Sequence, residues 1–145
     1  MEQIPQPQKM EPLNYTVRIG VNQLSPDHAL QIDNRLKEFL MTHQPFLQQS
    51  YTLKQLAEDI QIPLHHLSAL INQHYGVHFN DFINNYRIHY CTVKLLKEEW
   101  KQKKLEAIAE ESGFNNRNTF TAAFKKVTGI NPSEYLKNMK ENPPA

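Results

Sequence analysis

The sequence predicts an all-α protein built from a duplicated helical unit, and three observations support this prediction. One pattern of apolar residues occurs twice, at a spacing of 52 residues early in the unit and 53 later. Single glycines follow the predicted helices in both copies. In addition, 39% of the 145 residues are apolar and only four are glycines, which is typical of a packed, helix-rich core. A short helix, a tight turn and a longer helix in each copy is the pattern of a helix-turn-helix.

The corresponding residues have similar types in the two copies. They are Leu53, Leu56, Ala57, Ile62, Leu67, Leu70, Ile71, Gly76, Val77, Phe82 and Ile83 in the first, and Leu105, Ile108, Ala109, Phe114, Phe120, Ala123, Phe124, Gly129, Ile130, Tyr135 and Leu136 in the second. The predicted fold is therefore two helix-turn-helix subdomains joined by a long linker helix and preceded by an extra N-terminal helix.

The chain before the duplication divides into a leader and a helix. Residues 1–24 are rich in proline and read as a flexible leader, in which the alternation over 15–21 is compatible with a short strand. Ser25 and Pro26 supply a cap and a first-turn proline for an N-terminal helix within 25–50, which Pro45 ends. The apolar face expected for this helix consists of Leu30, Leu36, Phe39 and Leu40.

The first helix-turn-helix is expected over residues 51–78. Thr52 and Gln55 form a capping-box pattern at its start, and a second helix from about residue 64 to 75 ends at Gly76. The linker helix follows over 79–97, with a core-facing set of apolar and aromatic side chains. That set is Phe82, Ile83, Tyr86, Tyr90, Val93 and Leu96.

The second helix-turn-helix and a final helix are expected over residues 98–140, followed by a tail over 141–145. Gly113 suits a turn that needs positive φ, and Asn115 is the predicted cap of a helix from about 116 to 128. Asn131 and Pro132 begin the final helix.

Composition excludes several classes of protein. A single cysteine, Cys91, excludes an internal disulfide and suits a reducing compartment. We expect Cys91 to be a buried small residue. No secretory signal and no apolar run of about 20 residues is present. The chain lacks paired catalytic carboxylates, a nucleophile elbow and a Gly-rich phosphate loop, so we predict no enzyme and no cofactor. His74 and His78 have a metal-like spacing, but Gly76 interrupts the helix between them, and no metal site is predicted.

Specific motifs across residues 51–140 resemble the DNA-binding module of AraC/XylS-type bacterial transcription regulators. The matching residues are Leu56-Ala57, His66-Leu67-Ser68, Gly76, Phe79, Arg87, Leu95-Leu96, Ile108-Ala109-Glu110, Gly113-Phe114, Phe120, Phe124-Lys125-Lys126, Gly129, Pro132 and Tyr135. The helix over 30–49 is similar to one that precedes this module in a subgroup whose upstream region is a sensor. Gln61 replaces the usual turn glycine and Pro63 the usual serine cap, whereas Ala69 and Ala122 replace long polar residues that often read bases.

A recognition helix in the major groove needs polar side chains between its buried ones. The candidate DNA-binding residues are His65, His66, Ser68, Ala69, Asn72 and Gln73 in the first unit, and Asn115, Asn116, Arg117, Asn118, Thr121, Ala122, Lys125 and Lys126 in the second. Arg117 is expected to contact guanine, Asn72 and Asn118 adenine, and Thr121 the thymine methyl. Asn115, Lys125 and Lys126 are expected to contact phosphates.

The linker helix is long enough to join two bound units. About 19 residues at roughly 1.5 Å each make a rod of about 28 Å, and successive major grooves on one side of DNA lie about 34 Å apart. The net charge of +1 is uninformative, but the segment between residues 113 and 140 contains five basic residues and only one acidic residue. We therefore expect the second unit to contribute more phosphate affinity than the first.

The sequence predicts sequence-specific binding of double-stranded DNA and regulation of transcription. The resemblance implies RNA polymerase as a partner, an upstream sensor region or self-association in the natural protein, and no small-molecule site in this chain. It also implies a cytoplasmic location, including that of a cytosolic part of a membrane-attached regulator. The alternative is a protein-interaction or oligomerisation module of the same fold with little sequence-specific DNA binding, because the first unit is poor in lysine and arginine.

Overall fold

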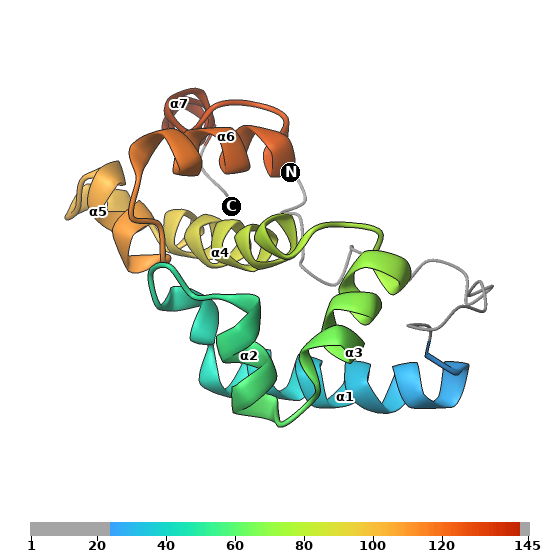
Figure 1. Ribbon diagram of the computed structural model, residues 1–145. Helices are drawn as coiled ribbons and strands as arrows, with labels where there is room; N and C mark the ends of the chain where they lie inside the picture. The colour runs from blue at the N-terminus through green and yellow to red at the C-terminus, as the bar shows by residue number, and fades with distance from the viewer. Residues whose placement is uncertain (1–23, 143–145) are drawn as a thin grey trace. The chain divides into compact units, whose positions relative to one another are not determined.

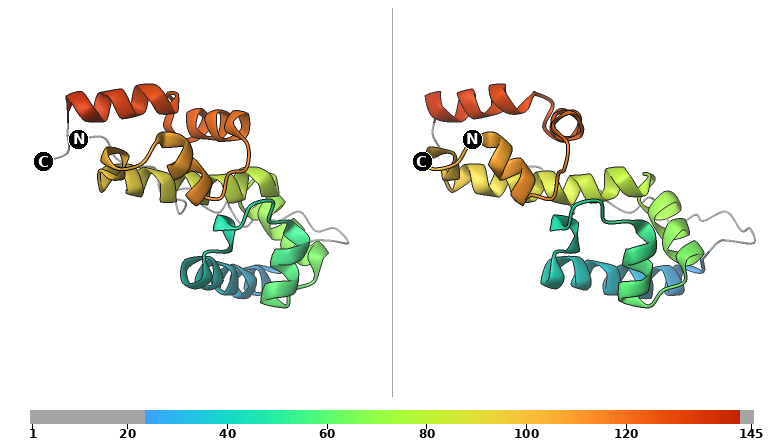
Figure 2. Two further views of the ribbon diagram at one scale, coloured as in Figure 1. Left: turned by 90° about the vertical axis from the view of Figure 1, so that its left-hand side faces the viewer. Right: turned by 60° about the vertical axis from the view of Figure 1, so that its left-hand side comes forward.

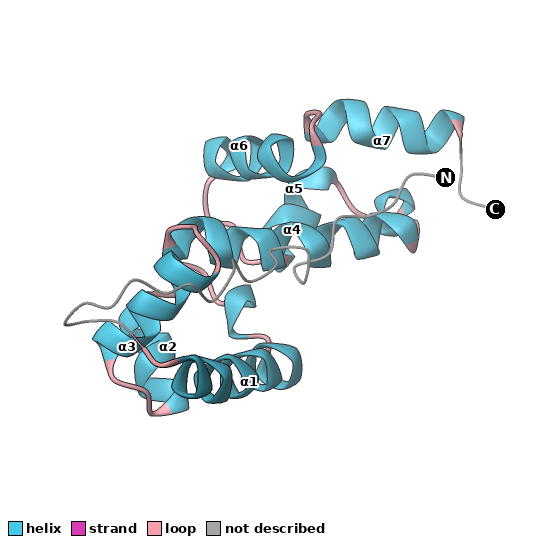
Figure 3. Ribbon diagram, turned by 90° about the vertical axis from the view of Figure 1, so that its right-hand side faces the viewer, coloured by secondary structure: helices cyan, strands magenta, loops and turns pink. Residues whose placement is uncertain are grey.

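The computed structural model describes residues 24–142, and every regular element within this range is helical (Figures 1 and 3). The helices are α1 (Pro26–His43), α2 (Leu53–Ile60), α3 (Leu64–Ala69), α4 (Phe79–Leu96), α5 (Leu105–Glu111), α6 (Arg117–Thr128) and α7 (Pro132–Glu141). Short 3₁₀ turns cover Pro45–Leu47 and Glu99–Lys101, and a π-helical turn, Leu70–His74, continues α3. The predicted all-α class is confirmed. The strand considered over 15–21 lies outside the described residues.

The described residues form two compact units, 24–83 and 84–142, called here the first and second unit. The boundary between them falls inside α4, so the chain passes from one unit to the other within a continuous helix. Each unit contains one short-helix, turn, longer-helix segment, as the duplication predicts.

The N-terminal helix α1 begins where the sequence predicts. The Ser25 side chain accepts a hydrogen bond from the His28 amide at 3.2 Å, and Pro26 occupies the first turn. Its buried stripe is Ala29, Ile32, Asp33, Leu36 and Leu40. The assignment of Leu30 to this stripe is wrong, because Leu30 lies about 100° around the helix from Ala29 and is 50% exposed.

The turn of the first helix-turn-helix uses a non-glycine residue in the left-handed region. The predicted capping box of Thr52 and Gln55 is present at the start of α2. Gln61 ends α2 with φ 57°, a left-handed conformation that costs an L-residue about 1–2 kcal/mol. Arg35 of α1 donates to the Ile60 carbonyl beside this turn. Pro63 precedes α3 without a side-chain cap, as expected.

The core of the first unit is built from the apolar faces of α1, α2 and α3 (Figure 2). Its fully buried side chains include Leu36, Leu40, Leu56, Leu67, Leu70, Ile71, Phe82 and Ile83. The helix predicted over 64–75 is present, but its second half is a wider π turn. Gly76, with φ 71°, follows Tyr75 as the predicted helix-ending glycine.

The second unit packs α5, α6 and α7 around the part of α4 that belongs to it (Figure 2). Phe124 is fully buried, and its ring contacts those of Phe120 and Tyr135 at centroid distances of 5.7 and 5.1 Å. Along α4, the stripe buried by this unit is Ile88, Cys91 and Leu95. The sequence pattern instead places Tyr90, Val93 and Leu96 in this stripe; all three are only partly buried, and of them Leu96 packs against this core.

The predicted cap of α6 is wrong by one residue. Asn116 has extended backbone angles, and its side-chain oxygen accepts a hydrogen bond from the Thr119 amide at 3.0 Å. The helix therefore begins at Arg117, and Asn115 precedes the cap. Gly113, with φ 102°, makes the predicted turn. Asn131 caps α7 through the Glu134 amide, as the sequence predicts.

Candidate nucleic-acid interface

The solvent side of α6 carries a continuous polar surface. Arg117, Asn118, Thr121, Ala122 and Lys125 fall within an arc of about 140° at about 100° per residue, and we call them the second reading face. All except the partly buried Thr121 are exposed. The opposite side of α6 is buried through Phe120, Ala123 and Phe124. The structure therefore brings these predicted residues together on one side of a helix whose other side is anchored in the core.

Two cations of the second reading face are available to a partner. Arg117 and Lys125 are exposed and form no ion pair with any residue in 24–142. Lys126 lies further around α6 and is also exposed, as are Asn115 and Asn116 before the helix. Exposed, unpaired cations beside short polar side chains suit a polyanion whose surface also presents hydrogen-bonding groups.

The first unit presents a smaller polar surface. His65, Asn72 and Gln73 are exposed, and Ser68 is partly buried. We call these four residues the first reading face. The Asn72 side-chain nitrogen donates to the Ser68 hydroxyl at 3.2 Å, so the two side chains hold each other in one orientation. No lysine or arginine belongs to this face, in contrast to the second.

Ala69 does not belong to the solvent face to which the sequence pattern assigned it. The structure leaves it 7% exposed. A side chain that ends at Cβ is short enough to be covered by longer neighbours. Ala122, which the sequence pattern likewise assigned to the solvent face of α6, is exposed.

The His66 ring contacts two other histidine rings. Its ring centroid lies 4.3 Å from that of His65 and 5.1 Å from that of His28 on α1. Burial, together with the electrostatic interaction with the neighbouring His65 and His28 rings, lowers the pKa of His66 below its ordinary value. Its Nδ1 is buried with no hydrogen-bond partner. No sequence signal pointed to His28, because α1 lies about forty residues before α3.

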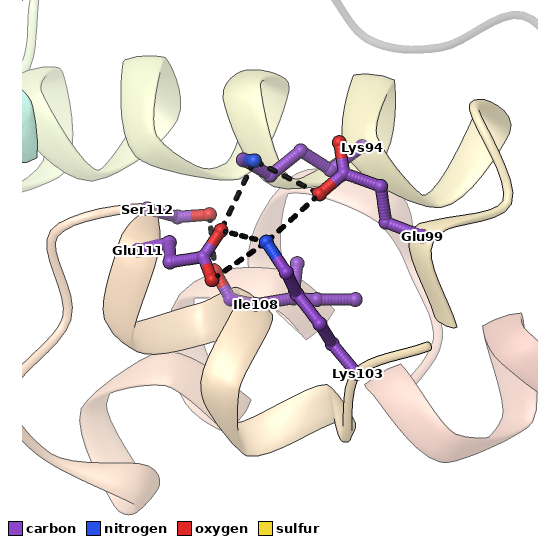
Figure 4. A network of polar contacts seen from close by, with 6 residues as sticks. All are labelled: Lys94, Glu99, Lys103, Ile108, Glu111 and Ser112. Carbon is purple, nitrogen blue, oxygen red and sulfur yellow. Dashed lines mark hydrogen bonds and ion pairs between the residues drawn. The ribbon is translucent and has the colours of Figure 1, made fainter. Parts of the chain in front are cut away.

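A network of ion pairs links α4, the segment 99–103 and α5 within the second unit (Figure 4). Lys94 of α4 pairs with Glu99 at 3.0 Å and with Glu111 of α5 at 3.1 Å. Lys103 pairs with the same two carboxylates at 3.5 and 2.9 Å. The hydrogen bonds from Lys94 and Lys103 lower the pKa values of Glu99 and Glu111 and raise those of both lysines. The network joins the end of α4 to the end of α5, immediately before the turn into α6.

Arg87 and Cys91 of α4 have structural environments. Arg87 donates to the Asn84 side chain at 3.0 Å, and its guanidinium lies 5.8 Å from the centre of the Phe114 ring. Cys91 is fully buried as predicted, and burial raises the pKa of its thiol to about 12. Trp100 packs against the core of the second unit, with Lys101 and Lys140 over its ring.

The described part of the chain holds neither a metal cluster nor a membrane-spanning helix. Within residues 24–142 no cluster of three or more histidine, cysteine or acidic side chains is arranged to hold a metal ion. No helix in that range has the length and apolarity needed to span a bilayer.

The sequence profile of a family described as a helix-turn-helix domain matches residues 56–138. The chain belongs to this AraC-type family. The match includes both turns, both reading faces and α4, so the resemblance inferred from the motifs is confirmed.

The AraC-type relatives with curated names are bacterial regulators. Transcriptional regulatory protein HptR of Staphylococcus aureus is 30% identical over 98 residues, which cover 65% of this chain and 37% of HptR. Regulatory protein PocR of Salmonella typhimurium is 24% identical over 76% of this chain and 35% of PocR. The HTH-type transcriptional regulator YtdP of Bacillus subtilis is 29% identical over 58% of this chain and 10% of YtdP. The AraC-type chain thus spans between a tenth and roughly a third of these relatives.

Two solved structures share the AraC-type fold. The C-terminal domain of AraT, a response regulator from Geobacillus stearothermophilus, is 29% identical with a TM-score of 0.62, covering 80% of this chain and 88% of that one. A Listeria innocua protein of unknown function is 33% identical with a TM-score of 0.59, covering 74% and 95%. The family and its named members are transcription regulators rather than enzymes.

Proposed function

We propose that this chain binds double-stranded DNA in a sequence-specific manner and thereby regulates transcription. The observation that carries the proposal is the second reading face, which presents unpaired cations and short polar groups on one side of a helix anchored by Phe120 and Phe124. Such a helix matches the width of the major groove, where base pairs display distinct donors, acceptors and methyl groups.

Each residue of the second reading face has a role in this proposal. Arg117, in the first turn of α6, pairs with guanine O6 and N7. Asn118 pairs with an adenine edge, and Thr121 contacts a thymine methyl group. Lys125 and Lys126, with Asn115 before the cap, contact phosphates and fix the position of the helix along the duplex.

The first unit contributes a second, weaker reading helix. Asn72 is the candidate adenine reader, because its bond to Ser68 uses one amide hydrogen and leaves the other hydrogen and the oxygen for adenine N7 and N6. Because His66 is packed against His28 and Ala69 is buried, we assign base contacts here to His65, Ser68, Asn72 and Gln73. We propose that α3 and α6 enter successive major grooves. The implied partners of the full-length protein are RNA polymerase and an upstream sensor region.

The test is selection of duplexes from a random library by the purified chain, followed by affinity measurement as a function of salt. We expect an enriched site with two conserved segments about 10 base pairs apart and an affinity that falls steeply with salt. Equal affinity for all duplexes would contradict the proposal. Equal or absent affinity would instead favour the interaction module that the first unit's lack of basic side chains suggests.

A further inference from the structure

A buried carboxylate of α1 is bonded to the end of the first recognition helix. Asp33 is 2% exposed. Its Oδ1 accepts a hydrogen bond from the Tyr75 hydroxyl, and its Oδ2 pairs with Lys37 Nζ at 3.1 Å. Tyr75 directly follows the π-helical turn Leu70–His74 and is itself buried. Two helices distant in sequence are therefore joined through one charged, solvent-shielded group.

This bond has a direction, whereas the surrounding contacts do not. Leu36 of α1, Leu67 of α3 and Leu70 of the π-helical turn are fully buried. Apolar contacts of this kind are non-directional and tolerate small shifts of one helix along another. A buried carboxylate is stable only while its hydrogen-bond and ion-pair partners stay in place. The Asp33–Tyr75 bond therefore selects one position of the α3 end against α1.

The selected position matters because the turn beside Tyr75 carries two reading residues. Asn72 and Gln73 lie within Leu70–His74 and point to solvent, and Asn72 is bonded to Ser68. The wide turn is closed by a long hydrogen bond from the Tyr75 amide to the Leu70 carbonyl at 3.4 Å. Such π-helical turns are rare and frequently occur at functional sites. The Tyr75 side chain, on the residue that follows the turn, anchors this end of the turn to Asp33 of α1.

We propose that Asp33 and Tyr75 are positioning residues for base recognition by the first unit, acting through the π-helical turn that carries Asn72 and Gln73. Neither side chain contacts DNA. The inference rests on the proposed function. It adds a role for α1, which lies outside the matched profile: through Asp33, this helix positions the residues that give the first unit its specificity.

The experiment compares two tyrosine-to-phenylalanine variants of the same unit. Tyr75→Phe removes only the hydroxyl that bonds Asp33. The matched control is Tyr51→Phe, since the buried Tyr51 donates a comparable bond to Asp59 at 2.5 Å but lies before α2. Affinities are measured for the selected duplex and for single-base variants of each half. The half whose base preferences survive Arg117→Ala belongs to the first unit.

We expect Tyr75→Phe to reduce base discrimination in the first unit's half by about fivefold or more, equivalent to roughly 1 kcal/mol. Discrimination in the other half and the salt dependence should not change. Tyr51→Phe should leave discrimination in both halves intact. In the free protein, the side-chain amide resonances of Asn72 and Gln73 should shift in Tyr75→Phe and not in Tyr51→Phe. Tyr75→Phe should change base discrimination little when Asp33→Ala is already present, because the Asp33–Tyr75 bond is then already lost.

Unchanged discrimination in Tyr75→Phe, or equal losses in the two phenylalanine variants, would overturn the positioning role while leaving the proposed function standing. Lack of any base preference in the wild-type chain would overturn both. The amide resonances test the positioning role without DNA: if they are the same in Tyr75→Phe as in the wild type, the inference fails.

Discussion

The Lys94 ammonium of α4 and the Glu111 carboxylate at the end of α5 lie 3.1 Å apart in a network that Lys94 shares with Glu99. Lys94 is the less exposed member of both pairs, with its side chain 15% exposed. Its removal leaves two carboxylates to share Lys103. We expect Lys94→Met to lower the unfolding free energy of the second unit by about 1 kcal/mol, more than a typical surface pair provides.

Urea unfolding at low and high salt measures this effect. The control is Lys101→Met, which removes the exposed pair with Glu98. The control should change stability little, and salt should reduce the difference between wild type and Lys94→Met. Equal effects of the two substitutions would show that the network does not support the second unit.

The left-handed backbone of Gln61 predicts a stabilising substitution. Gln61→Gly relieves a conformational cost of about 1–2 kcal/mol, which the greater freedom of glycine in the unfolded chain partly offsets. The first unit should therefore melt a few degrees higher. Gln102→Gly is the matched control, because Gln102 has φ −115° and its backbone is not in the left-handed region. This substitution should lower the melting temperature or leave it unchanged. A lower melting temperature for Gln61→Gly would contradict the strain argument.

The cap of α6 can be located by two adjacent alanine substitutions. Asn116→Ala removes the acceptor of the Thr119 amide and should cost about 1 kcal/mol. Asn115→Ala leaves the bond between Asn116 and the Thr119 amide in place, so it should not weaken this cap. Thermal unfolding of both variants distinguishes them, and the opposite order would restore the cap assignment made from sequence.

The stability of the first unit should depend on pH through two histidines. Burial lowers the pKa values of His66 and His74, so the folded state holds them neutral where the unfolded state binds protons. The contribution of these histidines to the unfolding free energy should therefore be at its maximum above about pH 6.5. It should fall as the pH decreases through the lowered pKa values. Glu99 and Glu111, whose pKa values are also lowered, extend the loss of stability to more acidic pH in the second unit. Chemical unfolding between pH 7.5 and 5 tests this sign, and greater stability at the acidic end would refute it.

Arg117 and Lys125 should affect DNA binding differently. Arg117→Ala should cost about 1–3 kcal/mol at the selected site and relax specificity at one base position. Lys125→Ala should weaken all sequences similarly and lower the salt slope by about one. Ser133→Ala is an exposed control in α7 with no expected effect. If neither substitution changes affinity, α6 is not a recognition helix.

Local chemistry allowed the sequence to predict most of the fold. Caps such as Ser25, Thr52 and Asn131 act over three or four residues, so their signals are contained in short segments. The places where the helix pattern was misread depend on neighbours. The residue after the π-helical turn Leu70–His74 is bonded to Asp33, about forty residues earlier in the chain. No sequence pattern within α3 predicts this turn.

The candidate site was predictable where a helix has one buried face. The second reading face follows from the positions of Phe120 and Phe124, because the remaining arc must face solvent. The first reading face was predicted less well, since His66 contacts His28 of α1 and Ala69 is covered despite its place among polar residues. Contacts between distant segments decide both cases, and a single sequence does not encode their geometry in any short motif.

The exposed arc of α6 has a consequence for engineering. Arg117, Asn118, Thr121 and Ala122 take no part in the apolar core of their unit, so a combinatorial library at these positions would vary molecular recognition without disturbing the architecture that presents it. The same strategy on α3 would disturb the edge-on contact between the His65 and His66 rings and the buried methyl group of Ala69. Retargeting to a new operator should therefore start from α6.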